Sequence, residues 1–443
     1  MRVLVLVDGE HYPPVTRWAI ETARGRGHEV VAALLVGGIE KIDPSRPLEL
    51  GVPLDLGGDD PASALRLAIA RRTPEAVLDL SDEPVLGYRE RMLLVAVALA
   101  EGLTYLGPDF RFEPPITGPR LPVPTLAVIG TGKRTGKTAI GGEVARIADR
   151  MGVNPVVVAM GRGGPQEPQV AEAGTIDLEH LLRLVRDGGH AASDYLEDAV
   201  TTGVTTIGAR RAGGGLAGAP YVTNVRAAAD LAVAHGAGLV IIEGSGAAIP
   251  PLPWDAGVLV VPASAPPEYL GGYLGPFRLL LSDAVVFTMA GSPNVGPENL
   301  SALRLHLQRL RPDARYVVTD FDPVPLADVR GKAAYLTTTA PDEAAERQAG
   351  HLEAAYGCTV VGWSARLADR AGLAEDLDGA EGYDVLLTEL KAAAVDVACE
   401  RAIARGAEVV FIDNRATAVD GGETSLAATL EHVIELAMER GSS

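Results

Sequence analysis

The chain has 443 residues, of which 47% are hydrophobic and 22% charged, and its formal net charge is −19. This length predicts two or three domains, and the composition is typical of a well-buried globular protein rather than a disordered one. Nucleic acids and anionic membranes are bound mainly through lysine and arginine, so the acidic balance argues against both as partners. Cys358 and Cys399 lie in separate segments and predict neither a disulfide nor a zinc site. No apolar run reaches membrane-spanning length, and we expect a cytoplasmic protein.

The first segment, residues 1–121, alternates strand and helix patterns. Apolar runs at 3–7, 29–38 and 76–82 predict strands, and helices are expected near 16–26, 62–72 and 89–101. This alternation predicts a parallel sheet with helices on both faces. Asp8, Glu10, His11 and Tyr12 follow the first strand, where they either line a pocket or cap the turn. Repeated prolines at 112–124 then place a domain boundary near Leu121.

The second segment, residues 122–296, opens with an apolar strand pattern that runs into a glycine-rich stretch. This stretch consists of Gly130, Thr131, Gly132, Lys133, Arg134, Thr135, Gly136, Lys137 and Thr138. A glycine-rich loop between a strand and a helix presents backbone N–H groups to phosphate oxygens, and its lysine reaches the terminal phosphates. We therefore expect these nine residues to bind ATP, with Lys137 catalytic and the hydroxyl of Thr138 as a ligand of Mg²⁺.

The spacing of this loop is unusual, because five residues separate Gly130 from Gly136 where the common motif has four. The pattern resembles GTxxxxGKT of dethiobiotin synthetase and its relatives, which transfer the γ-phosphate to small acids. Partitioning ATPases of the same branch carry a signature lysine at the position occupied here by Gly132. Because Lys133 is displaced by one residue, a dimerising switch ATPase is disfavoured. Lys133 is then either a catalytic cation or a solvated charge.

A carboxylate ends a later strand pattern of the same segment. The run at 238–246 predicts a buried strand that reaches Glu243 before two glycines. A carboxylate at the carboxyl end of a strand beside a phosphate loop is well placed to ligate Mg²⁺ during phosphoryl transfer. The sequence there is similar to the EGAGG of dethiobiotin synthetase. Glu243 is therefore predicted as a second metal ligand.

The insertion before that strand carries the residues expected to bind a small anionic substrate. It combines His190 with Arg210, Arg211 and a glycine run that includes Gly214. Arginine matches phosphate or carboxylate with two hydrogen bonds, histidine can move a proton, and glycine lets backbone approach a ligand. Arg162 follows another strand of the segment and should face the same crevice. We expect all five to contact substrate, and His190 and the arginine pair to take part in catalysis together with Lys137 and Lys133.

The third segment, residues 297–443, again alternates strand and helix patterns, so the whole chain is predicted to be α/β with a central P-loop domain of mostly parallel sheet. Lys391 stands at 388–398, where a strand turns into a helix. It is one of only five lysines in the chain. We expect it either to contact a substrate phosphate or to be solvated.

Several of these stretches together resemble the cyclic 2,3-diphosphoglycerate synthetase family. The likeness rests on 5–15, 130–139, 159–165, 190–218, 241–246 and 388–398. It implies an ATP- and Mg²⁺-dependent ligase that closes 2,3-diphosphoglycerate into its cyclic anhydride and releases ADP and phosphate. The residues fit this chemistry, because two like-charged phosphates must be brought together in a cationic, water-poor pocket. The nucleotide loop and the arginine pair are then expected to open onto one cavity.

Two other functions are compatible with the sequence. One is a 2-phosphoglycerate kinase or another P-loop enzyme that activates a small acid. The other is a nucleotide-dependent interaction protein or switch ATPase, which the substituted signature lysine and the arginine-rich insertion disfavour. The expected partner is a small-molecule substrate, 2,3-diphosphoglycerate, and a homodimer is left open.

Overall fold

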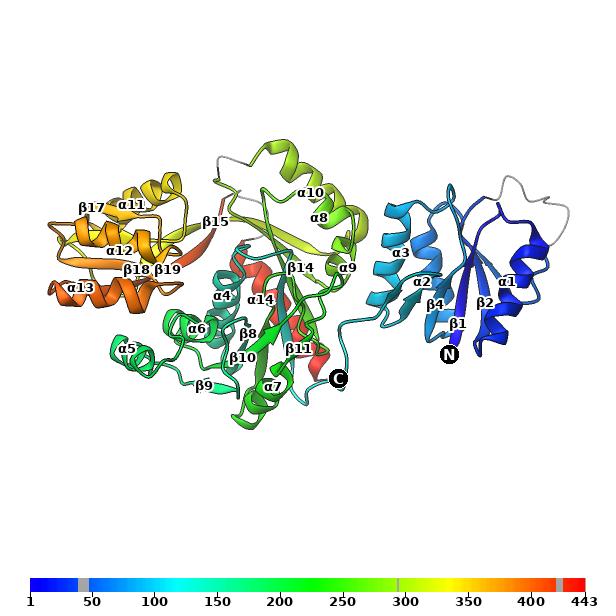
Figure 1. The fold of residues 1–443 in the computed structure, drawn as a ribbon, viewed down its shortest axis with the longest axis horizontal. Helices are drawn as coiled ribbons and strands as arrows, with labels where there is room; N and C mark the ends of the chain where they lie inside the picture. Colours follow the sequence, from blue (N-terminus) through cyan, green and yellow to red (C-terminus); the bar gives the residue numbers. More distant parts are fainter. Residues whose placement is uncertain (39–47, 293–294, 420–424, 443) are drawn as a thin grey trace.

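The computed structural model describes residues 1–38, 48–292, 295–419 and 425–442. Three α/β regions lie in a row along the longest axis of the molecule, in chain order from the blue to the orange part of Figure 1. The predicted α/β class with large, mostly parallel sheets is confirmed. The division of the chain at 121 and 296 stays a prediction.

The N-terminal region is a six-stranded sheet in the order β3-β2-β1-β4-β5-β6, parallel except for β6. Its strands are β1 (Arg2–Val7), β2 (Glu29–Leu35), β3 (Leu54–Leu56), β4 (Ala76–Asp79), β5 (Thr104–Leu106) and β6 (Arg111–Phe112). Its helices are α1 (Pro13–Gly25), α2 (Pro61–Arg72) and α3 (Tyr88–Ala100). The chain adds strands on one side of β1 and then returns to place β4 on the other, so a topological switch point lies between these two strands.

The central region surrounds β7, whose neighbours in the sheet are β12 and β13. Its strands are β7 (Thr125–Gly130), β8 (Pro155–Gly161), β9 (Gln169–Ala171), β10 (Thr206–Ala212), β11 (Val222–Thr223), β12 (Leu239–Glu243), β13 (Ala256–Pro262) and β14 (Ala284–Thr288). Its helices are α4 (Lys137–Arg150), α5 (Leu178–Arg186), α6 (Asp194–Thr202), α7 (Val225–Ala234), α8 (Glu268–Gly271), α9 (Gly275–Leu280) and α10 (Pro297–Leu310). Because β7, β8, β10 and β12 are parallel, their carboxyl ends meet at one edge.

The C-terminal region continues the same sheet through one long strand, β15 (Arg315–Pro325). The first half of β15 pairs with β14 in parallel, and the second half pairs with β19 (Glu408–Ala418) in the antiparallel sense. Beyond β19 follow β18 (Val385–Glu389), β16 (Ala333–Thr337) and β17 (Thr359–Ser364). The helices of this region are α11 (Asp342–Tyr356), α12 (Arg370–Gly379), the π-helical turn Ala394–Cys399 and α13 (Glu400–Ala404).

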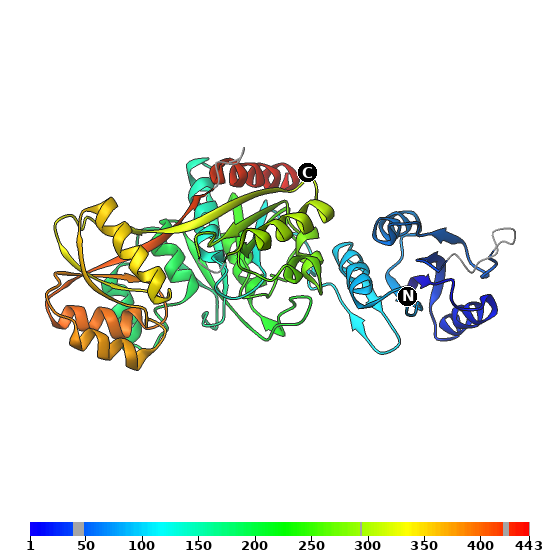
Figure 2. The same cartoon turned by 90° about the horizontal axis from the view of Figure 1, so that it is seen from above.

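The last helix, α14 (Leu426–Gly441), leaves the C-terminal region and lies along the central one, as the red helix in Figure 2 shows. Leu430, Val433 and Ile434 of α14 are buried in the same cluster as Ile140 and Val144 of α4. The helix that begins at the glycine-rich loop is therefore covered by the end of the chain.

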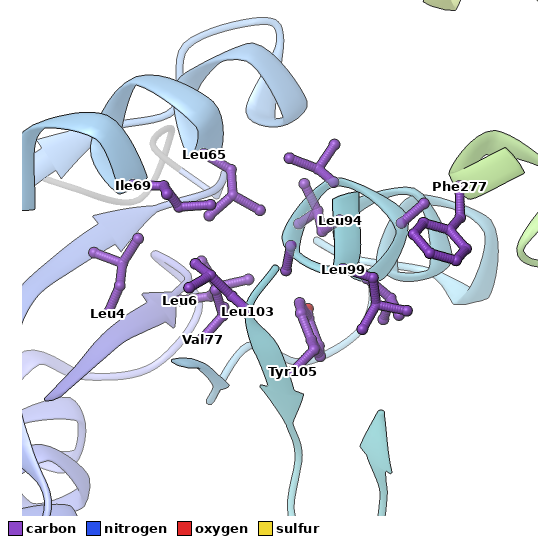
Figure 3. Packing of buried hydrophobic residues seen from close by; sticks show 14 of the residues in the cluster. Leu4, Leu6, Leu65, Ile69, Val77, Leu94, Leu99, Leu103, Tyr105 and Phe277 are labelled. Atoms are coloured by element: carbon purple, nitrogen blue, oxygen red, sulfur yellow. The ribbon is translucent and has the colours of Figure 1, made fainter. Parts of the chain in front are cut away.

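The N-terminal and central regions share a hydrophobic contact between α3 and α9. Figure 3 shows Leu94 and Leu99 of α3 beside Phe277 of α9, with Tyr105 close by. All four side chains are buried. Because these apolar side chains are removed from water, their burial stabilises the contact between the two regions.

Among the described residues, no helix is long and apolar enough to cross a membrane.

Candidate functional site

The predicted strand, glycine-rich loop and helix are present as β7, residues 131–136 and α4. The loop is held from β14, the second strand away from β7 in the sheet, because the hydroxyl of Thr288 donates to the carbonyl of Thr135 at 2.8 Å. Gly136 has a φ of +87°, and a Cβ atom added there would lie 2.5 Å from the ring of Phe321. Any larger residue would strain the backbone and meet this ring, so the position requires glycine.

Lys137 is 9% exposed and points back into the loop that precedes it. Its Nζ donates to the carbonyl of Gly132 at 2.7 Å and to the hydroxyl of Thr135 at 3.2 Å. Burial lowers the pKa of Lys137 to about 8, although the negative charges of Glu243 and Asp194 oppose this shift. The positive charges of two arginines, 162 and 211, lower the pKa further. Four charged groups around the loop therefore act on this one amine.

The other cations of the loop, Lys133 and Arg134, have exposed side chains. Arg134 has a φ of +59°, which is uncommon for a residue with a side chain. These two residues form the outer turn of the loop, where a triphosphate would approach from solvent.

Glu243 ends β12 and is 4% exposed. Its Oε1 has no hydrogen-bond partner among the described residues, and a Cβ atom added to Gly141 of α4 would lie 1.7 Å from that oxygen. Burial raises the pKa of Glu243 well above its usual value, and the charges of Asp194 and Glu197 add to the shift. The space for this carboxylate therefore depends on a glycine in the helix that follows the loop.

The donor set around the loop fits a nucleotide-bound Mg²⁺. Thr138 lies in the first turn of α4, and the unpartnered oxygen of Glu243 is a hard ligand of the kind Mg²⁺ prefers. In the described part of the chain, no group of three or more His, Cys, Asp or Glu side chains could hold a metal by itself. A magnesium ion that keeps several waters and binds phosphate oxygens needs only one or two protein ligands.

Arg162 and Arg211 come together over a second glycine close to Glu243. A Cβ atom added to Gly246 would lie 2.7 Å from Nη2 of Arg162 and 3.2 Å from Nη2 of Arg211. Arg211 is fixed by hydrogen bonds of 2.7 Å to the carbonyls of Ser245 and Gly213. Burial and the neighbouring Arg162 lower the pKa of the Arg211 guanidinium. The positive charges of Arg162 and Arg211 repel each other, and an anion bound between them would stabilise this arrangement.

Arg210 lies on the other side of β10 from Arg211, because successive residues of a strand point to opposite faces. Its Nε donates to the carbonyl of Pro165 at 2.9 Å and to that of Gly164 at 3.2 Å. The predicted arginine pair is therefore divided: Arg211 shares the neighbourhood of Lys137, and Arg210 holds the loop that follows β8.

His190 and Gly214 lie at the borders of this arrangement. A Cβ atom added to Gly163 would lie 2.7 Å from the ring of His190, so the histidine contacts the residue that follows Arg162. Gly214 belongs to the loop after β10, where a Cβ atom would lie 3.7 Å from Nη1 of Arg211. His190 thus lies beside the residue that follows Arg162, and Gly214 lies near Arg211.

Three acidic residues of α6 also belong to the site, and the sequence analysis did not select them. They are Asp194, Glu197 and Asp198. Asp198 is 1% exposed, and neither of its carboxylate oxygens has a hydrogen-bond partner in the part of the chain that the structure describes. Burial raises its pKa well above the usual value, and the charges of Glu243 and Glu197 add to this. Their spacing of three and four residues, which places them on one helix face, was the available signal.

Lys391 reaches the central region from the C-terminal one. Its Nζ lies 3.1 Å from Oε1 of Glu197, so it ion-pairs with α6. Burial raises the pKa of Glu197 to about 7, even though Lys391 opposes the shift. Although burial acts in the opposite sense, the charges of Glu197 and Glu389 raise the pKa of Lys391 above its usual value. This pair links the C-terminal region to the acidic face of α6.

Comparison with family models matches all three regions of the chain. The cyclic 2,3-diphosphoglycerate synthetase P-loop domain matches residues 125–320, the N-terminal domain of that family matches 2–113, and its C-terminal domain matches 325–415. The strand β15 thus contains the junction of two matched domains.

Proteins with the same family name are similar over the whole chain. The cyclic 2,3-diphosphoglycerate synthetase of Rubrobacter xylanophilus is 49% identical over 433 residues, covering 96% of this chain and 97% of the relative. That of Methanothermobacter thermautotrophicus is 41% identical over 447 residues, covering 98% and 96%.

Similarity to solved structures is weaker. LpxK from Aquifex aeolicus in complex with ATP has a TM-score of 0.42 at 14% identity, covering 72% of this chain and 90% of that one. HypB from Helicobacter pylori in complex with nickel has a TM-score of 0.29 at 18% identity, covering 45% and 79%. The full-length sequence relatives and the three matched domains decide the assignment: the chain belongs to the cyclic 2,3-diphosphoglycerate synthetase family, whose members are ligases.

Proposed function

We propose that this protein closes 2,3-diphosphoglycerate into its cyclic anhydride, using ATP and Mg²⁺ and releasing ADP and phosphate. The observation that carries the proposal is the shared surroundings of Lys137, Arg162 and Arg211 at one edge of the central sheet. A loop suited to a triphosphate and a pair of guanidinium groups suited to a second anion then serve one reaction.

The first step transfers the γ-phosphate of ATP to one phosphate of the substrate, and ADP leaves. Residues 130–138 hold the triphosphate, and Lys137 neutralises charge that develops on the transferred group. Thr138 and Glu243 would hold Mg²⁺, which would screen the repulsion between the phosphates. The unpartnered Oε1 of Glu243 supports this assignment.

The second step closes the ring. An oxygen of the other substrate phosphate attacks the inner phosphorus of the new anhydride, and the terminal group leaves as inorganic phosphate. Arg162 and Arg211 bring the two substrate phosphates together, because two adjacent guanidinium groups offset the repulsion between them. His190 beside Gly163 is placed to donate a hydrogen bond to the same substrate.

The remaining predicted residues take supporting roles in this proposal. Arg210 positions the loop after β8 through the carbonyls of Gly164 and Pro165. Lys391 can reach a substrate phosphate only if it exchanges its partner Glu197 for that phosphate. We also place the reaction in the cytoplasm, in keeping with the two unpaired, buried thiols of Cys358 and Cys399.

The test is to incubate the purified protein with ATP, Mg²⁺ and 2,3-diphosphoglycerate and to follow the products by ³¹P NMR. We expect a cyclic product with one free phosphate for each ADP. A kinase would instead form ADP from 2-phosphoglycerate without free phosphate. A switch ATPase would hydrolyse ATP slowly at a rate that neither acid changes, and either result would overturn the proposal.

A further inference from the structure

The N-terminal region has a pocket of its own, with a volume of about 500 Å³, at the carboxyl ends of β1 and β4. This is the switch point of the sheet, where open α/β sheets bind ligands, and the volume suits a small molecule. Every residue that lines the pocket lies between positions 7 and 110. The site described above lies on the central sheet, so the pocket is separate from it.

A histidine in this pocket is oriented by a buried carboxylate. Asp8 is 3% exposed, and its Oδ1 accepts hydrogen bonds from Nδ1 of His11 at 2.8 Å and from two backbone N–H groups. Its Oδ2 accepts from the backbone N–H of Asp82 at 2.7 Å. Because an ionised carboxylate only accepts hydrogen bonds, Nδ1 of His11 carries the proton and Nε2 is left to accept a hydrogen bond from a ligand.

An arginine in the same pocket is oriented in the same way. Asp79 is 2% exposed, and its Oδ2 accepts from Nε of Arg91 at 2.8 Å and from the hydroxyl of Tyr105 at 2.9 Å. Nη2 of Arg91 donates to the carbonyl of Ser81 at 3.0 Å, which leaves Nη1 for a ligand. Asp8, which follows β1, thus orients His11, and Asp79 of β4 orients Arg91.

The remaining residues that line the pocket indicate which other groups a ligand would carry. Asp82 and Asp109 are exposed carboxylates at its border and can accept hydrogen bonds from hydroxyl groups. Trp18 and Phe110 supply an apolar wall, and Trp18 is 71% exposed in the structure. A ligand that fits has one anionic group for Arg91, hydroxyl groups for Nε2 of His11 and for the carboxylates, and a short carbon skeleton.

We propose that this pocket binds a small hydroxy acid, with its carboxylate at Arg91 and its hydroxyl groups at His11, Asp82 and Asp109. The extra negative charge of the two border carboxylates favours a single carboxylate over a polyanion. The proposal does not depend on the central site being a synthetase, since it concerns binding to a region that holds no part of the nucleotide loop.

The test is calorimetric titration of the full-length protein with glycerate, with 3-phosphoglycerate and with glycerol, all without ATP. We expect glycerate to bind, 3-phosphoglycerate to bind several-fold more weakly, and glycerol not to bind. A change in tryptophan fluorescence that disappears in Trp18→Phe would assign the binding to this pocket. Because no turnover is measured, a failed cyclisation assay leaves this test intact.

Two conservative variants locate the contacts. His11→Asn keeps a donor for Asp8 and removes Nε2, and Arg91→Lys keeps a charge for Asp79 and removes the guanidinium. Each is expected to weaken glycerate binding at least 10-fold at an unchanged melting temperature, whereas Arg89→Lys, on the exposed side of α3, should bind normally. Absence of glycerate binding at millimolar concentration, binding of 3-phosphoglycerate alone, or wild-type affinity for glycerate in both variants would overturn the proposal.

Discussion

Buried carboxylates occur in both the N-terminal and the central region, but only those of the N-terminal region have their full set of partners. Asp8 and Asp79 accept hydrogen bonds from backbone N–H groups and from His11, Arg91 and Tyr105. In the central region, Oε1 of Glu243 and both oxygens of Asp198 are buried without a partner among the described residues.

The two regions thus contain two kinds of buried carboxylate: those with hydrogen-bond partners and those without one among the described residues. A satisfied carboxylate stabilises the fold and orients a neighbour, whereas an unsatisfied one costs free energy until a cation or proton reaches it. The raised pKa of Glu243 and Asp198 expresses this cost, and its main cause in both is burial. The unpartnered carboxylates therefore lower the stability of the central region, as is common at functional sites.

The largest expected effect comes from removing the amine of Lys137, which interacts electrostatically with the unpartnered carboxylate of Glu243. We expect Lys137→Ala to lower turnover about 10³-fold, because charge stabilisation at the transferred phosphate is lost. The measurement is steady-state ADP release with saturating substrates. Lys332→Ala, which removes a lysine paired with Glu408 in the C-terminal region, is the matched control and should retain activity. Near-normal turnover in Lys137→Ala would remove the loop from the reaction.

A smaller effect should separate the two neighbouring arginines. Arg211→Ala is expected to raise KM for the organic substrate by about 10- to 100-fold, because a charged hydrogen bond to an anion is worth roughly 1.5–3 kcal/mol. Arg210→Ala should change KM much less, since its guanidinium faces the loop at Gly164 and Pro165. Equal effects of the two substitutions would contradict the division between the faces of β10.

The comparison of carboxylates can be tested by stability. Asp79→Asn should lower the free energy of unfolding by about 1–3 kcal/mol, because Arg91 and Tyr105 lose their charged acceptor. Asp198→Asn should not lower it at pH 7, since no hydrogen bond to that side chain is lost within the described residues. Urea unfolding of both variants at pH 7 measures these free energies. A comparable loss of stability in the two variants would contradict the proposed difference between the two carboxylates.

The direction of the pH dependence of Asp198 follows from its raised pKa. Between the unfolded pKa near 4 and the folded value, the folded state binds more protons, so wild-type stability falls as pH rises. Asp198→Asn should show a shallower fall as the pH rises above 4. A slope identical to that of the wild type would show that Asp198 does not hold the extra proton.

The smallest effect concerns the amine of Lys137 without nucleotide. Its folded pKa of about 8 lies below the usual 10.5, so the unfolded state binds more protons between these values. Stability of the nucleotide-free protein should therefore gain a contribution as pH rises from 8 to 10.5, and Lys137→Met should lack it. ATP affinity should fall a few-fold over pH 8–9, as the amine loses its proton. Thermal unfolding and nucleotide titration across this range provide the check.

The local patterns of the chain predicted much of the fold. Alternating apolar runs and turn residues located α3 and β12 within a few residues, because propensity and burial agree there. The continuation of the sheet through β15 into the C-terminal region was not predicted. It depends on pairing with β19, almost a hundred residues later, which no local pattern contains.

The candidate site was predicted in part for similar reasons. Lys137 and Glu243 were selected because each follows a strand of a recognisable pattern, and the structure places both at one edge of the sheet. Arg210 and Arg211 were treated as a pair although alternate residues of a strand face opposite sides. Asp198 was missed because only the packing of α6 shows that its carboxylate is buried.

The position of α14 affects how the molecule can be made. The helix covers Ile140 and Val144 of the nucleotide-binding helix, yet residues 426–441 leave the ribosome only after the strands of the C-terminal region. The hydrophobic surface of α4 must therefore stay uncovered while the whole C-terminal region is synthesised. A nascent chain halted before residue 426 should bind ATP poorly and aggregate readily, even though its glycine-rich loop is already complete.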